Sequence, residues 1–280
     1  ALKHMAVGEF LSDAVDAACG KAGLTPDECL LYHVMLYENS GGLWKGSPKG
    51  AIGPSQIMRK WIVAWQKNLT DDLSTENFWA EPGFDGRYDP IANIEMGARI
   101  LKQEMKNFGR NRPDLAILAF NQGSGAARSF VRAWMDKHKV TANLAEMLED
   151  TELSKKFMPS DNGGRGYLSK IIAMQEISTD PAKFGIEKRA VEELPIATNA
   201  NGTVLYKWDE AFTPMHMPAG ESLRKFATKH GMNLGQLLFL NRQIRNPDAK
   251  FSRQARLWIL RQNAPVPHAL AARMTQKVPN

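Results

Sequence analysis

Residues 25–42 decide the fold, and they read TPDECLLYHVMLYENSGG. Thr25 suits an N-cap, Pro26 suits the first helical position, and Glu28 completes a capping box. The pair of glycines at the end of the stretch is typical of a helix C-terminus. The pattern therefore predicts a helix over residues 26–38.

Glu38 lies on the apolar stripe of this helix, because Leu31, Val34 and Met35 precede it at helical spacing. Desolvation on that face and the negative end of the helix dipole are both expected to raise the pKa of Glu38. A carboxyl group that stays protonated near neutral pH can act as a general acid. The alternative is a glutamate whose hydrogen bonds are satisfied near a helix end.

Three further blocks follow this helix. Residues 50–58 read GAIGPSQIM, a glycine-bounded turn before an apolar segment. Residues 119–125 read AFNQGSG, which again places an amide side chain and glycines at a helix end. Residues 166–168 read GYL and begin a further predicted helix.

The four blocks, in this order, resemble the soluble lytic transglycosylases, the bacterial relatives of goose-type lysozyme. The resemblance covers roughly residues 25–178. Five positions differ from the usual family pattern: Asn39 in place of Ser, Pro54-Ser55 in place of Leu-Met, Arg59 in place of Pro, and Phe120 in place of Tyr.

The resemblance implies that Glu38 first protonates the leaving oxygen of a glycosidic bond. The 6-hydroxyl of N-acetylmuramic acid (MurNAc) then attacks its own anomeric carbon, and Glu38 takes the proton from that hydroxyl. The resemblance also implies that Tyr167 orients Glu38. The other residues expected to bind substrate are Ser55, Gln56, Ile57, Phe120, Asn121 and Gly123.

The residue types fit this chemistry. Gln56 and Asn121 carry both donors and acceptors, which suit the acetamido and hydroxyl groups of a sugar, although isolated amides of this kind more often cap turns. Most retaining glycosidases pair their acid with a second carboxylate, and the motif blocks contain none. Asp85 and Asp89 lie nearby in sequence, and the sequence Asp89-Pro90 suits a helix start. The alternatives are a muramidase that admits water and a wall-binding protein without turnover.

A mainly α, lysozyme-like domain is expected over residues 6–185. Helices are predicted at 9–19, 26–38, 90–108, 113–121, 124–134 and 167–176. Residues 66–89 form an irregular stretch and are a candidate for cleft lining.

Residues 186–201 are polar and contain proline, so they are predicted to be a linker. The sequence predicts strands at 204–206 and 255–260, with helices at 222–230 and 234–240 between them. Residues 212–260 resemble a LysM module, a small β-α-α-β fold that binds glycans containing N-acetylglucosamine (GlcNAc). The predicted domain spans 202–262, and a tail spans 263–280. The alternative is a packing module without sugar affinity.

The linker suggests that residues 1–190 fold and cleave without the second domain. The LysM resemblance implies that this domain adds affinity for the wall.

The net charge of +6 suits an anionic partner such as the cell wall. No stretch is apolar for long enough to span a bilayer, and no motif indicates nucleic acid, a metal or a cofactor. Peptidoglycan strands are the expected partner, a cell-envelope assembly is a further candidate, and the envelope is the expected location.

Cys19 and Cys29 could form a disulfide or remain buried thiols. Residues 1–5 resemble a cloning remnant. No signal-peptide pattern is visible, so the leader was removed or export takes another route.

Overall fold

The computed structural model describes residues 11–29, 32, 43–44, 46–67, 77–157, 164–185 and 208–261. This part of the chain is mostly helical, with two small antiparallel sheets. The mainly α class predicted from the sequence is therefore confirmed. No helix among the described residues is long and apolar enough to cross a membrane.

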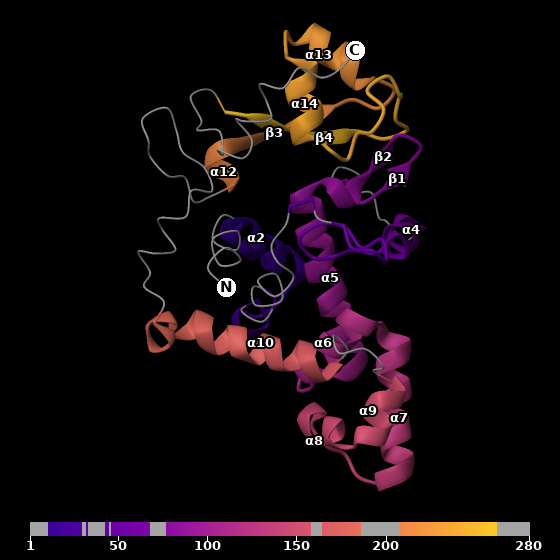
Figure 1. Ribbon diagram of the computed structural model, residues 1–280. Helices are drawn as coiled ribbons and strands as arrows, with labels where there is room; N and C mark the ends of the chain where they lie inside the picture. Colours follow the sequence, from indigo (N-terminus) through magenta and orange to yellow (C-terminus); the bar gives the residue numbers. More distant parts are fainter. Residues whose placement is uncertain are drawn as a thin grey trace.

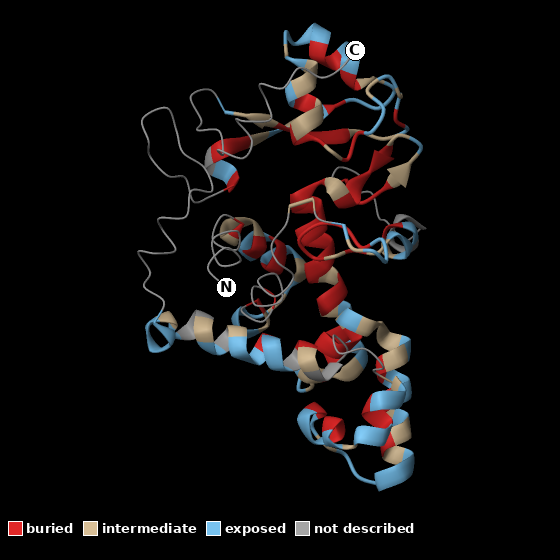
Figure 2. Cartoon of the chain, viewed as in Figure 1, coloured by how far each residue is buried: buried red, intermediate tan, exposed pale blue. Residues whose placement is uncertain are grey.

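Helix α5 (Pro90–Phe108) runs through the middle of the molecule (Figure 1). The Asp89 carboxylate caps its start by accepting hydrogen bonds from the backbone N–H groups of Ile91 and Ala92. Gly109 follows its end with a φ of 92°. Both boundaries agree with the sequence prediction. The first three turns are buried almost all round, as Figure 2 shows.

The remaining helices of the larger part pack around α5 or extend from it (Figure 1). They are α2 (Ser12–Ala22), α4 (Arg59–Lys67), α6 (Pro113–Gln122), α7 (Ser124–His138), α8 (Leu144–Glu149), α9 (Thr151–Phe157) and α10 (Gly164–Thr179). Helices α2, α6, α7 and α10 overlap predicted segments with ends shifted by a few residues, whereas α4, α8 and α9 were not predicted. Two 3-10 helices, η2 (Gly86–Tyr88) and η3 (Pro181–Phe184), complete this part.

The predicted irregular stretch 66–89 contains a hairpin where the structure describes it. Strands β1 (Ala80–Glu81) and β2 (Phe84–Asp85) pair antiparallel. The rings of Trp79 and Phe84 stack with centroids 3.7 Å apart, and both side chains are buried. These aromatic rings lie inside a core, so the expectation that the stretch lines a cleft is wrong for residues 77–79 and 84–85.

The C-terminal unit consists of α12 (Trp208–Ala211), β3 (Phe212–Met217), α13 (Leu223–Lys229), α14 (Leu234–Leu240) and β4 (Ala255–Leu260). Strands β3 and β4 pair antiparallel, from Phe212 opposite Leu260 to Met217 opposite Ala255. The two helices lie against this sheet (Figure 1). The strand predicted at 204–206 and the linker at 186–201 lie outside the described residues.

The C-terminal unit shares its core with the larger part of the chain. Trp79 and Phe84 of the hairpin region belong to the same apolar cluster as Phe226 and Phe251. Trp258 belongs to the cluster that holds the inner faces of α2 and α5. Because the two parts bury each other's side chains, independent folding of residues 1–190 is no longer expected.

Candidate functional site

Glu38 and the residues around it lie outside the described residues, so its role stays a prediction. The start of its helix is described, and the predicted capping box is present. The Thr25 N–H donates to the Glu28 carboxylate at 2.7 Å, and the Glu28 N–H lies 3.4 Å from the Thr25 hydroxyl. These bonds satisfy two N–H groups that have no partner inside the helix.

A disulfide between Cys19 and Cys29 ties the start of this helix to α2, with the two Cα atoms 5.7 Å apart. The sequence left the pairing open, and the structure contains the bond. The described start of the helix predicted to extend to Glu38 is therefore attached covalently to α2.

Tyr32 connects this helix to the second sequence block. Its side chain is fully buried, and its hydroxyl donates to the backbone carbonyl of Ile94 on α5. The Ser55 hydroxyl lies 2.7 Å away. The one phenolic proton is used on Ile94, so the Ser55 hydroxyl is the donor in the second bond. Burial raises the pKa of Tyr32, so the phenol is neutral at physiological pH.

Two glycines make room for this arrangement. A Cβ on Gly97 would collide with the side chains of Ser55 and Tyr32. A Cβ on Gly53 would collide with Asn93, and Gly53 has a φ of +79° that side chains rarely adopt. Larger residues at either position would push the turn away from α5.

The second block forms a tight turn over residues 50–57. The backbones of Ile52 and Ile57 exchange two hydrogen bonds of 2.9 and 3.1 Å. Gln56 adopts a left-handed φ of 50°, and its side-chain amide donates to the Gly53 carbonyl at 2.8 Å. This amide is partly exposed, so it lies on the outer side of the turn.

Ser55 and Ile57 were both expected to bind substrate, and their side chains face the interior. Ser55 is completely buried, and Ile57 is 2% exposed. Ile57 packs in an apolar cluster with Phe78 and Met96. In the structure these two residues support the turn.

Two buried polar residues, Arg87 and Asn93, hydrogen-bond to the backbone of the turn. Neither was predicted as a site residue. The Arg87 guanidinium donates to the carbonyls of Gly50 at 2.8 Å and Ile57 at 3.3 Å. The Asn93 amide donates to the Ile52 carbonyl at 2.7 Å and accepts from the Ser55 N–H at 2.7 Å. Neither Arg87 nor Asn93 lies in a recognisable sequence motif. Their role in holding the turn depends on contacts between distant residues, so the sequence contains no signal for it.

The third block lies at the end of α6. Phe120 is partly exposed and packs against two clusters, one containing Tyr32 and the other containing Ile57. Asn121 is exposed, and Gly123 has a φ of 90°. Through Phe120, the C-terminal end of α6 therefore contacts the apolar clusters that contain Tyr32 of the first block and Ile57 of the second block.

A pocket of about 520 Å³ lies between the start of α4 and the third block. Lys60 and Trp61 of α4 form one side, directly after the turn. Residues 122–126, which include Gly123, form the other side. The pocket presents an aromatic ring, an amide and glycine backbone, a combination that suits a sugar.

Tyr167 of α10 is 5% exposed and belongs to the same apolar cluster as Tyr32. The late tyrosine thus lies in the core behind the predicted acid helix. Its predicted contact with Glu38 involves a residue that the structure does not describe.

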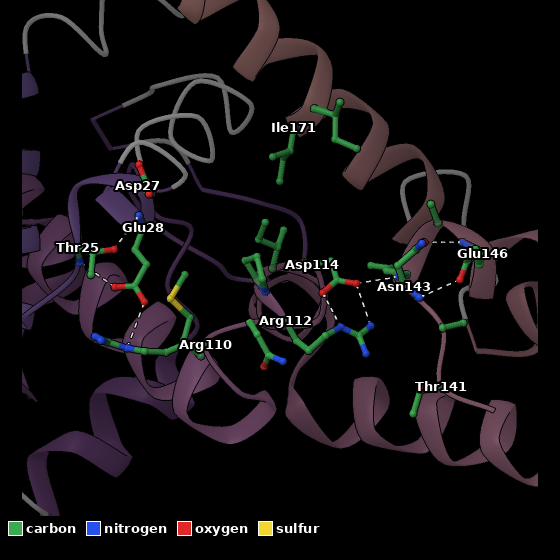
Figure 3. Close-up of a pocket in the computed structure, with 18 residues that line it drawn as sticks. Thr25, Asp27, Glu28, Arg110, Arg112, Asp114, Thr141, Asn143, Glu146 and Ile171 are labelled. Carbon is green, nitrogen blue, oxygen red and sulfur yellow. Dashed lines mark hydrogen bonds and ion pairs between the residues drawn. The ribbon is translucent and has the colours of Figure 1, made fainter. Parts of the chain in front are cut away.

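A second cavity, of about 960 Å³, lies elsewhere (Figure 3). It opens between the residues around Thr25, the loop before α6 and the start of α8, and two ion pairs lie along its lining. Arg112 donates to Asp114 in two bonds of 2.9 and 3.0 Å, and Arg110 lies 3.3 Å from Glu28. Its lining includes Thr25, Asp27 and Glu28 from the start of the first block, but none of the described residues that were predicted to bind substrate.

The described residues contain no group of three or more His, Cys, Asp or Glu side chains that could hold a metal ion.

The family model of the transglycosylase SLT domain matches residues 21–143. Residues 21–143 are therefore similar to the SLT domain of transglycosylases. The match includes Glu38, the turn at 50–57 and the third block, and it ends before Tyr167.

No curated protein matches the chain. Among solved structures, an inactive mutant of the lytic transglycosylase Slt from Pseudomonas aeruginosa is similar at 18% identity and a TM-score of 0.41. The similarity covers 65% of this chain and 25% of that one, so this chain spans only a part of the larger enzyme's length.

Proposed function

We propose that this chain is a lytic transglycosylase that cleaves the MurNAc-β-1,4-GlcNAc bond of peptidoglycan. The observation that carries the proposal is the SLT domain match over residues 21–143, which contains Glu38 and the second and third motif blocks. The alternative functions are a muramidase, which would use water, and a wall-binding protein that does not cleave the glycan.

In the proposed mechanism one carboxyl group acts twice. Glu38 donates its proton to the glycosidic oxygen, the bond from that oxygen to the MurNAc anomeric carbon breaks, and GlcNAc leaves with a free hydroxyl. The MurNAc 6-oxygen then bonds to the anomeric carbon, and the Glu38 carboxylate takes the 6-hydroxyl proton. The product is 1,6-anhydroMurNAc, no water is consumed, and Glu38 returns to its starting state.

We assign substrate contact to Trp61 and Gly123 of the pocket and to the partly exposed or exposed groups of the neighbouring motif blocks. Gln56 and Asn121 would bond the acetamido and hydroxyl groups, and the ring of Trp61 would face a sugar ring. Phe120 would contact substrate through its exposed edge. Gly123 allows the substrate to approach the backbone closely, and Tyr167 would orient Glu38.

Digestion of peptidoglycan in ¹⁸O-water tests the reaction. A transglycosylase gives muropeptides lighter by one water and free of the heavy oxygen. Heavy oxygen in most new chain ends would identify a muramidase. An absence of cleavage by the folded protein would leave only the binding protein.

For the C-terminal unit we propose glycan binding, on the LysM resemblance of residues 212–260 and the strand-helix-helix-strand order of β3, α13, α14 and β4. NMR titration of the full chain with GlcNAc oligosaccharides tests it. Amide shifts confined to residues 46–61 and 119–126 would place all binding at the SLT domain.

The cell envelope is the proposed location, with peptidoglycan strands as the partner and an envelope assembly as a further candidate. The disulfide between Cys19 and Cys29 supports an oxidising compartment such as the periplasm or the exterior. Fractionation of cells that express the natural protein, with thiol labelling of each fraction, tests both points.

A further inference from the structure

Residues 77–89 lie between the C-terminal unit and the turn at 50–57, and they contact both. On one side they pair with backbone and side chains of residues 241–258. On the other side Arg87 bonds the turn directly. Two routes of hydrogen bonds cross this segment.

The first route begins at the backbone of Gln243, whose carbonyl accepts from the Asp85 N–H at 2.8 Å. The Asp85 carboxylate accepts from the Arg87 guanidinium in bonds of 2.7 and 3.0 Å. The same guanidinium donates to the carbonyls of Gly50 and Ile57. Three successive bonds therefore connect the C-terminal unit to the turn.

The second route begins at Trp258 of β4, whose indole N–H donates to the Asp89 carboxylate at 3.0 Å. Asp89 also accepts from Asn77 at 2.7 Å and lies 3.4 Å from the Arg256 guanidinium. As the N-cap of α5, Asp89 fixes the first turn of the helix, where Asn93 bonds both sides of the motif turn.

The side chains of both routes are buried, so their hydrogen bonds are costly to break. Asp89 and Asn93 are completely buried, and Arg87 is 6% exposed. Water has no access to replace a lost partner there, so each bond costs more to break than one at the surface. A displacement of the C-terminal unit would leave buried charges without partners.

We infer that the C-terminal unit positions the substrate-binding turn of the SLT domain, and that Arg87 and Asp89 are the positioning residues between them. The inference rests on the proposed function for its kinetic consequence. Its structural consequence, the stiffness of the turn, can be measured without substrate.

The first comparison uses two Arg–Asp pairs of matching geometry. Arg87→Lys keeps the positive charge but removes the guanidinium group, whose several N–H donors bond Asp85 and the turn at the same time. Arg112→Lys makes the same change in the pair with Asp114, which has bonds of 2.9 and 3.0 Å and does not contact the turn. Arg87→Lys should lower kcat/KM by about 10-fold to 100-fold through a higher KM and a lower kcat, because misplaced substrate contacts lose both.

The second comparison uses two buried indoles. Trp258→Phe removes the N–H bond to Asp89, and Trp134→Phe removes a bond of the same 3.0 Å length to the Val140 carbonyl. The readout is hydrogen exchange at the Ile52 and Ile57 amides, which bond across the turn. Trp258→Phe should speed this exchange by about 10-fold, because it leaves a buried charged acceptor without one partner. Trp134→Phe should leave it within about 2-fold, as a remote change in a stable protein does.

The outcomes separate positioning from general stability. A variant that merely unfolds in part loses kcat in proportion and keeps KM, whereas loss of positioning raises KM and loosens the two amides. If Arg87→Lys fails to fold, Trp258→Phe decides through the same exchange measurement. Unchanged exchange in Trp258→Phe, or equal changes in Trp258→Phe and Trp134→Phe, would overturn the inference. If no variant and not even the wild type cleaves peptidoglycan, the proposed function fails while the exchange result still decides the positioning role.

Discussion

The hydroxyl oxygens of Tyr32 and Ser55 lie 2.7 Å apart in the interior, and they join the helix of the predicted acid to the motif turn. The bond places the two blocks in register through side chains that do not reach the surface. The two residues are 23 positions apart in the sequence. Several consequences can be measured.

Tyr32→Phe is expected to lower the free energy of unfolding by about 1–3 kcal/mol, because the Ile94 carbonyl and the Ser55 hydroxyl lose a buried partner. Ser55→Ala removes the other side of the same bond. In a double-mutant cycle by urea unfolding, the two changes should couple by about 0.5–3 kcal/mol. Strict additivity would show that the bond contributes no coupling energy.

Glu38→Gln is expected to fold normally and to lose cleavage by about 10²-fold to 10⁴-fold, since an amide cannot donate and then accept the same proton. Release of muropeptides from purified peptidoglycan measures the loss, and circular dichroism controls for folding. Asp136→Asn, an exposed change on α7, gives a control of equal size. Near-normal turnover by folded Glu38→Gln would remove Glu38 from the mechanism.

The double variant Cys19→Ser, Cys29→Ser is expected to lose about 2–3 kcal/mol of stability, from the entropy of closing a loop of this length in the unfolded chain. Thermal unfolding with and without a reducing agent checks this. The agent should lower the Tm of the wild type and leave that of the variant unchanged. A wild type that does not respond to reduction would mean that the bond is absent in solution.

Asp114 predicts a pH dependence of stability. Burial tends to raise its pKa, but hydrogen bonds from Arg112 and from the Leu144 N–H outweigh burial and lower it. A carboxyl whose pKa is lowered in the folded state stabilises the protein above the unfolded pKa of about 4, and this contribution is lost as the pH falls through the folded pKa.

Asp114→Asn should therefore be less stable than the wild type by about 1–2 kcal/mol at pH 7, from the loss of charged hydrogen bonds. The difference should shrink steadily below about pH 4. Urea unfolding at a series of pH values gives both curves. A difference that stays constant from pH 7 to pH 2 would show that the charge of Asp114 does not contribute.

The shared core predicts one cooperative unfolding transition for the full chain. Phe84→Ala, in the hairpin, should cost about 3–5 kcal/mol and should lower the Tm of the whole protein, because Phe84 packs inside the C-terminal unit. Calorimetry measures the transition. Two separate transitions, with only one shifted in the variant, would restore the independent domains predicted from the sequence.

Local signals predicted α5 and the start of the helix at Thr25, together with their caps, but not the shorter helices α4, α8 and α9. Asp89-Pro90 and Gly109 set both ends of α5, and Thr25 with Glu28 formed the expected capping box. These features depend on hydrogen bonds between residues close together in the chain, so a short stretch of sequence is sufficient. The order of the motif blocks similarly indicated the SLT domain.

Only the tertiary structure decided what each polar side chain does. Asp89 was correctly predicted as a cap, but its bond with Trp258 crosses 169 residues, and no local pattern contains it. Ser55 was predicted to bind substrate, but in the structure its side chain is buried against Tyr32 and Gly97. The direction in which a turn residue points depends on which helix packs against it, and that choice is made by long-range burial of apolar surface.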